Sequence, residues 1–383
     1  MEKLGIYIHV PFCKSKCFYC NFSSIACQNL KKDTEENLIS RWYKAVITEI
    51  INKAEFITEY KIDTIYIGGG TPSLVNENYI VDIINLIKNI ADTKDAEITI
   101  ELNPGTVTNE KISAYKSVGV NRFSIGMQST KNDVLKKIGR IHKIEEVEEC
   151  INILKENNIE NYSLDYIYGL PDQNIENIKD EIETIIKLNP KHISTYDLEV
   201  HEESKLEFLI ENAYLVVPTD DEVVDIRHIA EDILEKNGYE KYEISNFAKK
   251  GFESKHNNRY WNQKKYIGFG PAASSFYDGM RFTNISDLNE YLDKIENGKS
   301  ASILEEELDK LGLMREYIIL KLRLKYGVNR EEFYQKFKED IDKYFLNEIS
   351  KLKKLELLKE ENENIFLTQK GLDLANMVWE EFI

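Results

Sequence analysis

Three of the five cysteines lie within eight residues near the amino terminus, and they constrain the fold more than any other feature. Cys13, Cys17 and Cys20 have the spacing C-x3-C-x2-C and follow the apolar run 6–10. That run is typical of a β-strand, and Pro11 ends it because proline has no N–H to donate to a ladder. A loop after a strand can present three thiolates to one point. Three sulfurs are one short of the four that normally bind a [4Fe–4S] cluster, so one iron stays open to a small molecule.

Other uses of these cysteines fit the sequence less well. A zinc site usually takes four nitrogen or sulfur ligands in two pairs, and no second pair follows the first. A disulfide framework is unusual in a long chain without a secretory segment. Cys27 lies beyond the tight loop and Cys150 lies in a helical stretch, so we expect both to be bystanders.

Length and charge limit the classes of partner. A chain of 383 residues suits one large α/β domain and a smaller one. The net charge of −17 is spread over helical faces of mixed sign, which argues against nucleic acid as a partner because phosphate binding needs clustered positive charge. No apolar run approaches the roughly 20 residues that span a bilayer, and the amino terminus has no signal-type core. Free cysteines and an air-sensitive cluster, without a targeting segment, predict a cytoplasmic location.

Short β-rich runs alternate with helical stretches over the first 200 residues. The predicted strands are 6–9, 64–67, 98–102, 122–125, 162–168 and 192–200, and the helices between them are 35–55, 79–90, 109–118, 144–157 and 175–188. Six strands joined by helices imply right-handed crossovers and a parallel sheet, so we predict an α/β fold with a curved, partial (β/α)6 barrel. In barrels of this type the chemistry takes place at the carboxyl ends of the strands.

A glycine turn and an acidic residue lie at two of these ends. Gly69 and Gly70, followed by Thr71, come after the second strand, where consecutive glycines let the backbone approach a ligand and leave amide hydrogens free. Glu101 ends the third strand, where its carboxylate can accept a hydrogen bond from a ligand or cap the next helix.

Three more polar residues follow the same pattern. Gln128 ends the fourth strand, and Arg140 comes after it with a guanidinium that can pair with a carboxylate. Asp165 is a polar residue in an otherwise apolar strand, and a buried carboxylate needs a hydrogen-bonding partner. Each of these residues alone has an equally good structural explanation, such as a tight turn or a cap.

Together, the cysteine motif and these positions resemble the radical S-adenosylmethionine (SAM) superfamily. The segment 7–13, YIHVPFC, is more specific and looks like the oxygen-independent coproporphyrinogen oxidase group. In that superfamily the amino and carboxylate groups of SAM chelate the open iron, and the reduced cluster splits SAM into methionine and a 5′-deoxyadenosyl radical. The resemblance covers about residues 6–200 and implies a partial (β/α)6 radical SAM barrel.

The resemblance also implies a role for each residue of the pattern. Cys13, Cys17 and Cys20 would hold the [4Fe–4S] cluster. Tyr7 would contact the methionine part of SAM, and Tyr19 would offer an aromatic face to its adenine. The remaining SAM contacts that the resemblance implies are Gly69, Gly70, Thr71, Glu101, Gln128, Arg140 and Asp165.

A second motif, H-N-x-x-Y-W over 256–261, is similar to the heme-binding signature of the HemW-type radical SAM heme chaperones. An imidazole can ligate heme iron, and a Tyr-Trp pair can pack on a porphyrin face. The alternative is a turn whose aromatic rings anchor it to the core. Given the resemblance upstream, we predict heme binding by His256, Tyr260 and Trp261. One departure is Ser274, where relatives usually carry a histidine.

These features predict a radical SAM protein that binds heme and delivers it to acceptor (respiratory) proteins. The alternative is an oxygen-independent coproporphyrinogen III oxidase. Against it, Phe22 stands where such oxidases have a further cysteine, and their amino-terminal extension is missing. A plain iron–sulfur electron carrier would leave the glycine turn and Arg140 unexplained. We expect an electron donor for the cluster, and membrane contact only through the acceptor.

Composition divides the chain into three predicted parts: a radical SAM core at 1–235, a linking segment with the heme motif at 236–286, and a helix-rich domain at 287–383. In the last part we expect amphipathic helices over 311–324, 330–337 and 341–355, a hairpin of 357–359 with 365–368, and a final helix over 371–379. This arrangement resembles the small winged-helix-like carboxyl-terminal domain of the group. No basic face stands out, so we expect it to serve as a lid or docking surface.

Overall fold

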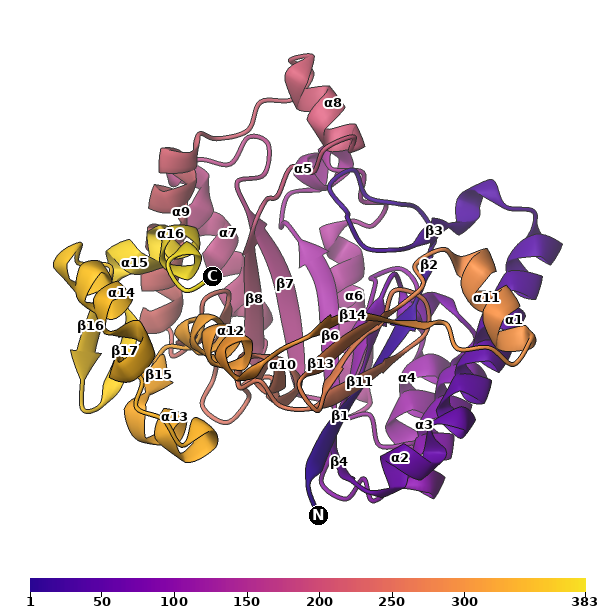
Figure 1. Cartoon of the computed structure of the whole chain (residues 1–383). Helices are drawn as coiled ribbons and strands as arrows, with labels where there is room; N and C mark the ends of the chain where they lie inside the picture. Colours follow the sequence, from indigo (N-terminus) through magenta and orange to yellow (C-terminus); the bar gives the residue numbers. More distant parts are fainter.

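The computed structural model describes residues 1–383, and its centre is a run of seven neighbouring parallel strands in a 12-stranded sheet (Figure 1). In sheet order these strands are β11 (Tyr266–Phe269), β1 (Lys3–Val10), β4 (Lys61–Gly69), β5 (Glu97–Leu102), β6 (Arg122–Gln128), β7 (Tyr162–Tyr168) and β8 (His192–Asp197). All six predicted strands are confirmed. The last one ends at Asp197, three residues earlier than predicted.

Helices cover the outer face of these strands (Figure 1). They are α1 (Lys32–Asn52), α2 (Ala54–Thr58), α3 (Glu77–Ile90), α4 (Asn109–Ser117), α6 (Ile144–Glu156), α7 (Ile175–Leu188) and α9 (Asp220–Lys236). The helix predicted over 35–55 is two helices, because the backbone leaves the helical region at Lys53 (φ −102°, ψ 5°). None of the helices combines the length and the apolar character that crossing a bilayer requires.

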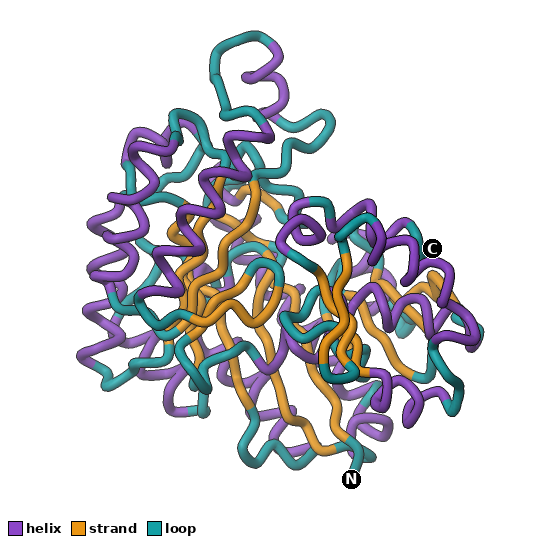
Figure 2. The backbone as a smooth tube through the Cα atoms, turned by 90° about the vertical axis from the view of Figure 1, so that its left-hand side faces the viewer, coloured by secondary structure: helices purple, strands orange, loops and turns teal.

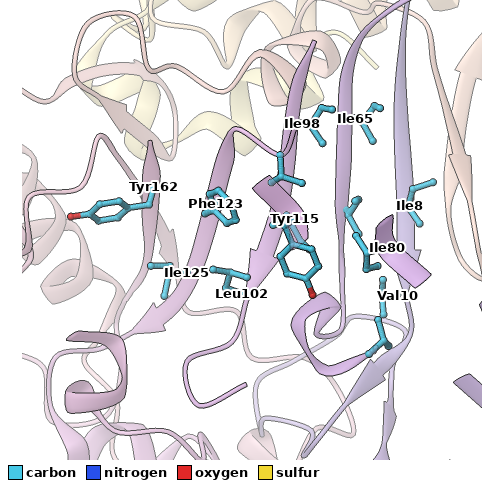
Figure 3. Close-up of a cluster of buried hydrophobic side chains, with 14 of the residues drawn as sticks. Ile8, Val10, Ile65, Ile80, Ile98, Leu102, Tyr115, Phe123, Ile125 and Tyr162 are labelled. Atoms are coloured by element: carbon cyan, nitrogen blue, oxygen red, sulfur yellow. The ribbon is translucent and has the colours of Figure 1, made fainter. Parts of the chain in front are cut away.

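Alternation along the strands separates an apolar outer face from a polar inner face. Ile8 and Ile65 point outward with the other apolar residues of the core and pack against the helices, including Ile80 of α3 and Tyr115 of α4 (Figure 3). This core holds 57 buried residues. Since successive side chains point to opposite faces of a strand, the polar residues of the same strands face the inside of the barrel.

The sheet extends at both ends beyond the predicted barrel. On one side β11 is followed by the antiparallel strands β12 (Ser274–Tyr277), β13 (Met280–Asn284) and β14 (Ser302–Glu307), and on the other β8 is followed by β10 (Asn246–Ala248) and β9 (Glu240–Glu243). In the sequence, helix α10 (Lys255–Trp261) lies between β10 and β11, and helix α11 (Leu288–Glu296) lies between β13 and β14. Helix α11 packs against α1, where Arg41 forms an ion pair with Glu296 at 2.7 Å. The structure therefore joins α11 and β14 to the main sheet, and the predicted boundaries at 235 and 286 stay predictions.

The carboxyl-terminal part has a core of its own, with 18 buried residues. It consists of α12 (Lys310–Leu322), β15 (Val328–Asn329), α13 (Arg330–Phe337), α14 (Asp342–Lys354), β16 (Leu358–Glu361), β17 (Asn364–Leu367), α15 (Gln369–Asp373) and α16 (Ala375–Glu380). The predicted amphipathic helices and the hairpin are present, and the last predicted helix is divided into α15 and α16. In Figure 2 this part lies beside the main sheet, near the carboxyl terminus.

One arginine links the two cores. The Arg323 guanidinium lies 4.4 Å from the ring centroid of Trp261 and 4.9 Å from that of Trp379, so it stands between helix α10 and the last helix, α16. Cation–π contacts of this kind each contribute about 0.5–2 kcal/mol. The Lys325 amide also donates to the Tyr242 carbonyl at 3.0 Å.

Candidate functional site

The three motif cysteines lie in a loop at the carboxyl end of β1. Cys13 ends the short strand β2 (Phe12–Cys13), which pairs with β3 (Ile25–Ala26), and Cys17 and Cys20 follow in the loop. Helix α8 (Lys205–Glu211), which projects at the top of Figure 1, packs on this loop. The Leu206 amide donates to the Phe18 carbonyl at 3.2 Å, and the Lys205 ammonium lies 3.9 Å from the Phe18 ring centroid.

A cavity of about 460 Å³ opens below this loop, and we call it the cysteine cavity. It gathers side chains from the carboxyl ends of five parallel strands. The sequence-predicted residues that line it are Cys13, Cys17, Cys20, Tyr19, Gly69, Gly70, Thr71, Glu101, Gln128, Arg140 and Asp165. Of the predicted cluster and SAM residues, Tyr7 alone does not line it. The fold thus brings together residues that span more than 150 positions of the chain.

The donor set of the cysteine cavity suits an iron–sulfur cluster. All three thiols are free of disulfides. Thr71 Oγ1 donates to Cys13 Sγ and Arg140 Nη1 donates to Cys17 Sγ, each at 3.6 Å, and both contacts favour the thiolate. Burial raises the pKa of the Cys13 and Cys20 thiols, so binding of a metal there releases protons. No three His, Cys, Asp or Glu side chains lie close enough together to bind a single metal ion. This spacing is consistent with a [4Fe–4S] cluster, because each cysteine of such a cluster binds a different iron.

Glycine is required at both positions of the turn after β4. Gly69 has φ 110°, and a Cβ there would lie 2.5 Å from His9 Cε1. A Cβ at Gly70 would lie 2.7 Å from the Phe12 carbonyl oxygen, which belongs to the backbone and cannot rotate away. The turn therefore packs directly against the strand that leads to Cys13.

Glu101 is the best-connected carboxylate of the cysteine cavity. It accepts hydrogen bonds from the Tyr66 hydroxyl at 2.8 Å and from the Gly69 amide at 3.0 Å. Burial, with the negative charge of Asp165 nearby, raises the pKa of Glu101 to about 7. The carboxyl thus changes charge near neutral pH, and this change alters its affinity for a ligand that carries a hydrogen-bond donor or a positive charge.

Asp165 and Arg140 line the same cavity. The Ser124 hydroxyl donates to the Asp165 carboxylate at 3.3 Å, and burial raises the pKa of Asp165. Arg140 Nη2 donates to the Gly126 carbonyl at 2.5 Å, which fixes the guanidinium beside the cysteine loop. A bulge in β6 turns the Gln128 backbone to φ 70°, so its side chain also faces the cavity.

Sequence reasoning missed several residues of this cavity. Tyr66, Ser124 and Arg122 line it, and Arg122 is 2% exposed and forms no ion pair. Ser124 lies four positions and Arg122 six positions before Gln128 on β6, and Tyr66 lies three positions before Gly69 on β4. The alternation that singled out Asp165 as a polar residue in an apolar strand would have found them as well.

A second cavity of about 570 Å³, here the aromatic cavity, holds part of the predicted heme motif. Tyr260 and Trp261 line it, and so does Tyr7, which we expected beside SAM. Asn21 and Phe22 line both cavities. The aromatic cavity is therefore next to the cysteine loop.

His256 contacts its motif partner Tyr260 but does not reach the aromatic cavity. It is 1% exposed and lines neither cavity. Its Nδ1 lies 2.8 Å from Thr64 Oγ1 and its Nε2 lies 2.7 Å from the Tyr260 hydroxyl, so both ring nitrogens are engaged. Burial, together with the charges of Arg259 and Arg122, lowers the pKa of His256 to about 3. In this conformation His256 anchors α10 under the barrel, and heme ligation by His256 stays a prediction that requires these contacts to break.

Comparison with known proteins agrees with this geometry. The family model of the radical SAM superfamily matches residues 7–185, and that of the HemN C-terminal domain matches residues 308–374. The heme chaperone HemW of Lactococcus lactis is 35% identical over 381 residues, which cover 98% of this chain and 96% of that protein. The heme chaperone HemW of Bacillus subtilis is 32% identical over 379 residues and 98% of each chain.

A solved structure shows the same fold at lower identity. Coproporphyrinogen III oxidase (HemN) from Escherichia coli has a TM-score of 0.85 and 22% identity, and the match covers 100% of this chain and 90% of that one. This likeness confirms the predicted fold class, an α/β radical SAM barrel with a small carboxyl-terminal domain. On the extent and level of its similarity to the chaperones, the chain belongs to the HemW family of radical SAM proteins.

Proposed function

We propose that this protein is a heme chaperone that carries a [4Fe–4S] cluster, binds SAM, and delivers heme to acceptor proteins. The observation that carries the proposal is the similarity to heme chaperones over nearly the whole of both chains. The aromatic cavity beside the cysteine loop supports it, because this second cavity can hold a large apolar ligand separately from the cysteine cavity.

The residues of the cysteine cavity fit the two cofactors. Cys13, Cys17 and Cys20 would hold the cluster and leave one iron open. When bound and reduced, the cluster supplies the electron that cleaves the sulfonium of SAM. Glu101 and the Gly69 turn would hold the polar groups of SAM, and Asp165 would accept from its ribose hydroxyls. Arg140 keeps a positive charge beside the thiolates through its contact with Cys17.

Phe22 argues against the coproporphyrinogen oxidase alternative. Its side chain is 66% exposed and lies at the junction of the two cavities, where the oxidase pattern has a further cysteine. An exposed phenyl ring has no acid–base or metal-binding chemistry. It suits contact with an apolar ligand or a partner surface.

The function is tested with anaerobically reconstituted protein. We expect it to bind heme with a defined stoichiometry and to transfer it to an apo-acceptor, such as an apo-cytochrome, and we expect no decarboxylation of coproporphyrinogen III with SAM and reductant. The measurements are a heme titration, the heme content of the re-isolated acceptor, and product analysis of the porphyrin. Decarboxylation without heme binding would show that the oxidase assignment is the correct one.

The pKa of Glu101 predicts a pH dependence of SAM binding. With a pKa of about 7, the carboxyl is ionised in about one-tenth of the molecules at pH 6 and about nine-tenths at pH 8. The ionised form accepts a hydrogen bond more strongly, so SAM affinity is expected to rise up to about tenfold over this range. Glu101→Gln is expected to bind SAM more weakly and independently of pH, while Glu110→Gln, exposed on α4, keeps the wild-type profile. Calorimetry from pH 6 to 8 measures this, and a flat wild-type profile would contradict it.

The remaining partners follow from the proposed chemistry. The cluster requires an electron donor, and the acceptor is a heme protein whose own location sets any contact with a membrane. The five free cysteines suit a reducing compartment, and we place the protein in the cytoplasm.

A further inference from the structure

The cysteine cavity extends from the cysteine loop toward the amino ends of the barrel strands, and we call that inner part the floor. Gln128 lines the cavity at the carboxyl end of β6, and Arg122 lines it at the amino end of the same strand. Six residues of a strand span about 20 Å, so these two backbone positions are far apart. None of the predicted SAM contacts stands at the amino end of a strand. The SAM pattern therefore assigns no ligand to the floor.

Arg122 is a buried cation without a partner at this floor. The residue is 2% exposed, and no carboxylate lies within ion-pair distance of its guanidinium. Its Nε is buried without a hydrogen-bond partner, and so is Oγ1 of Thr99, which stands opposite Arg122 in the register of β5 and β6. A buried charge that is left unpaired costs several kcal/mol. Two orphaned polar groups at one place, open to a cavity, indicate a site for an anion.

Helix α10 supplies a further polar group to the floor. The His256 amide donates to Glu97, the first residue of β5, at 3.1 Å, so α10 begins beside the amino end of this strand. Asn257 follows and lines the cysteine cavity. Its backbone amide donates to Ser254 Oγ at 3.2 Å, whereas its side-chain amide has no partner within the chain. A carboxamide offers two N–H donors, so Asn257 can bind an oxygen of a ligand held by Arg122.

The charges near the floor favour an anion with a single negative charge. The planar guanidinium of Arg122 can donate two parallel hydrogen bonds to a carboxylate. Glu101 and Asp165 line the same cavity; burial raises the pKa of both carboxyls, and the charge of Arg122 opposes that rise. These two carboxyls repel a phosphate monoester, which carries nearly two negative charges, more strongly than they repel a carboxylate.

The carboxylate of SAM belongs at the other end of the cavity. In the superfamily it chelates the open iron of the cluster. The guanidinium beside the thiolates is that of Arg140, whose Nη1 donates to Cys17 Sγ at 3.6 Å. Arg122 starts β6 at the opposite end. Binding of SAM at the cysteine loop thus leaves Arg122 without an ion-pair partner.

We propose that the floor of the cysteine cavity binds the carboxylate of a small molecule other than SAM, with Arg122 as its ion-pair partner and Asn257 as a hydrogen-bond donor. This inference rests on the SAM-binding function proposed above and adds a second ligand to the same cavity. Asn257 belongs to α10, whose Tyr260 and Trp261 line the aromatic cavity. A ligand at the floor therefore contacts the helix that lines both cavities.

The subsite is tested with propionate as the carboxylate probe and propionamide as its uncharged counterpart. Saturation-transfer difference NMR on the reconstituted protein, with and without SAM, measures the Kd of each probe. We expect wild-type protein to bind propionate in preference to propionamide, Arg122→Gln to raise the propionate Kd at least tenfold, and Asn257→Leu to raise it severalfold. Arg315→Gln, at an exposed position of α12, is the matched control and leaves this Kd unchanged.

The cluster content and the SAM response of each variant show whether it has folded. Arg122→Gln with an intact cluster and an unchanged propionate Kd overturns the subsite. Wild-type protein that binds propionate no better than propionamide overturns it as well, and Arg122 then only balances the charges of Glu101 and Asp165. If Arg122→Gln does not fold, unchanged Kd values in both Arg122→Lys and Asn257→Leu overturn the subsite. Wild-type protein that binds propionate through Arg122 but binds no SAM contradicts the proposed function alone.

Discussion

Replacement of Cys17 by alanine is expected to abolish the [4Fe–4S] cluster, and the same holds for Cys13 and Cys20. A [4Fe–4S] cluster usually has four cysteine ligands, and this chain supplies three. A variant with two cysteines would leave two of the four irons without a protein ligand. Iron and sulfide content of the anaerobically reconstituted variants should fall to near zero, and SAM should no longer change the spectrum.

The chain supplies its own controls for this experiment. Cys27 and Cys150 are buried and line neither cavity. Cys27→Ala and Cys150→Ala should therefore keep a full cluster that responds to SAM. A Cys17→Ala variant with full iron content and a SAM-dependent spectrum would remove these thiols from the cofactor site.

Trp42→Ala is expected to have the largest effect on stability, about 3–5 kcal/mol of unfolding free energy. Trp42 of α1 is fully buried, and its ring meets Phe12 edge to face with centroids 5.9 Å apart. Its indole N–H donates to the His9 carbonyl at 3.0 Å. The change thus leaves a cavity behind the strand that carries the cysteines, and a buried carbonyl without a donor.

Trp42→Phe separates the two contributions. It keeps most of the packing and loses the hydrogen bond, so we expect a loss of about 1–3 kcal/mol, clearly smaller than for alanine. Urea unfolding followed by circular dichroism measures both variants. Equal stability of wild type and Trp42→Ala would show that α1 does not support the cysteine strand as described.

The barrel could be predicted from the sequence because its signals are local. Each parallel strand is a short apolar run, and the polar residues at its carboxyl end fall in phase with the inner face, as Glu101 and Asp165 do. The carboxyl ends of parallel strands meet at one edge, so eleven of the predicted site residues share one cavity.

The rest depends on contacts between distant segments. The burial of His256 comes from Thr64 and Tyr260, and nothing near residue 256 indicates that β4 lies beneath it. The strands β12–β14 are short and carry charges such as those of 305–307, so they lack an apolar alternation that marks a strand. Tyr7 is expected to contact the methionine part of SAM, but the position of β11 beside β1 places it at the second cavity.

The position of Arg323 between two indoles has a consequence for how the protein releases what it carries. Trp261 is at once a wall of the aromatic cavity and one half of the clamp that holds the last helix through Arg323 and Trp379. An occupant that displaces this wall also pulls on the clamp. Displacement of Trp261 by cargo therefore opposes docking of the carboxyl-terminal part, and by linkage an acceptor that holds the last helix in its docked position favours unloading by the same free energy.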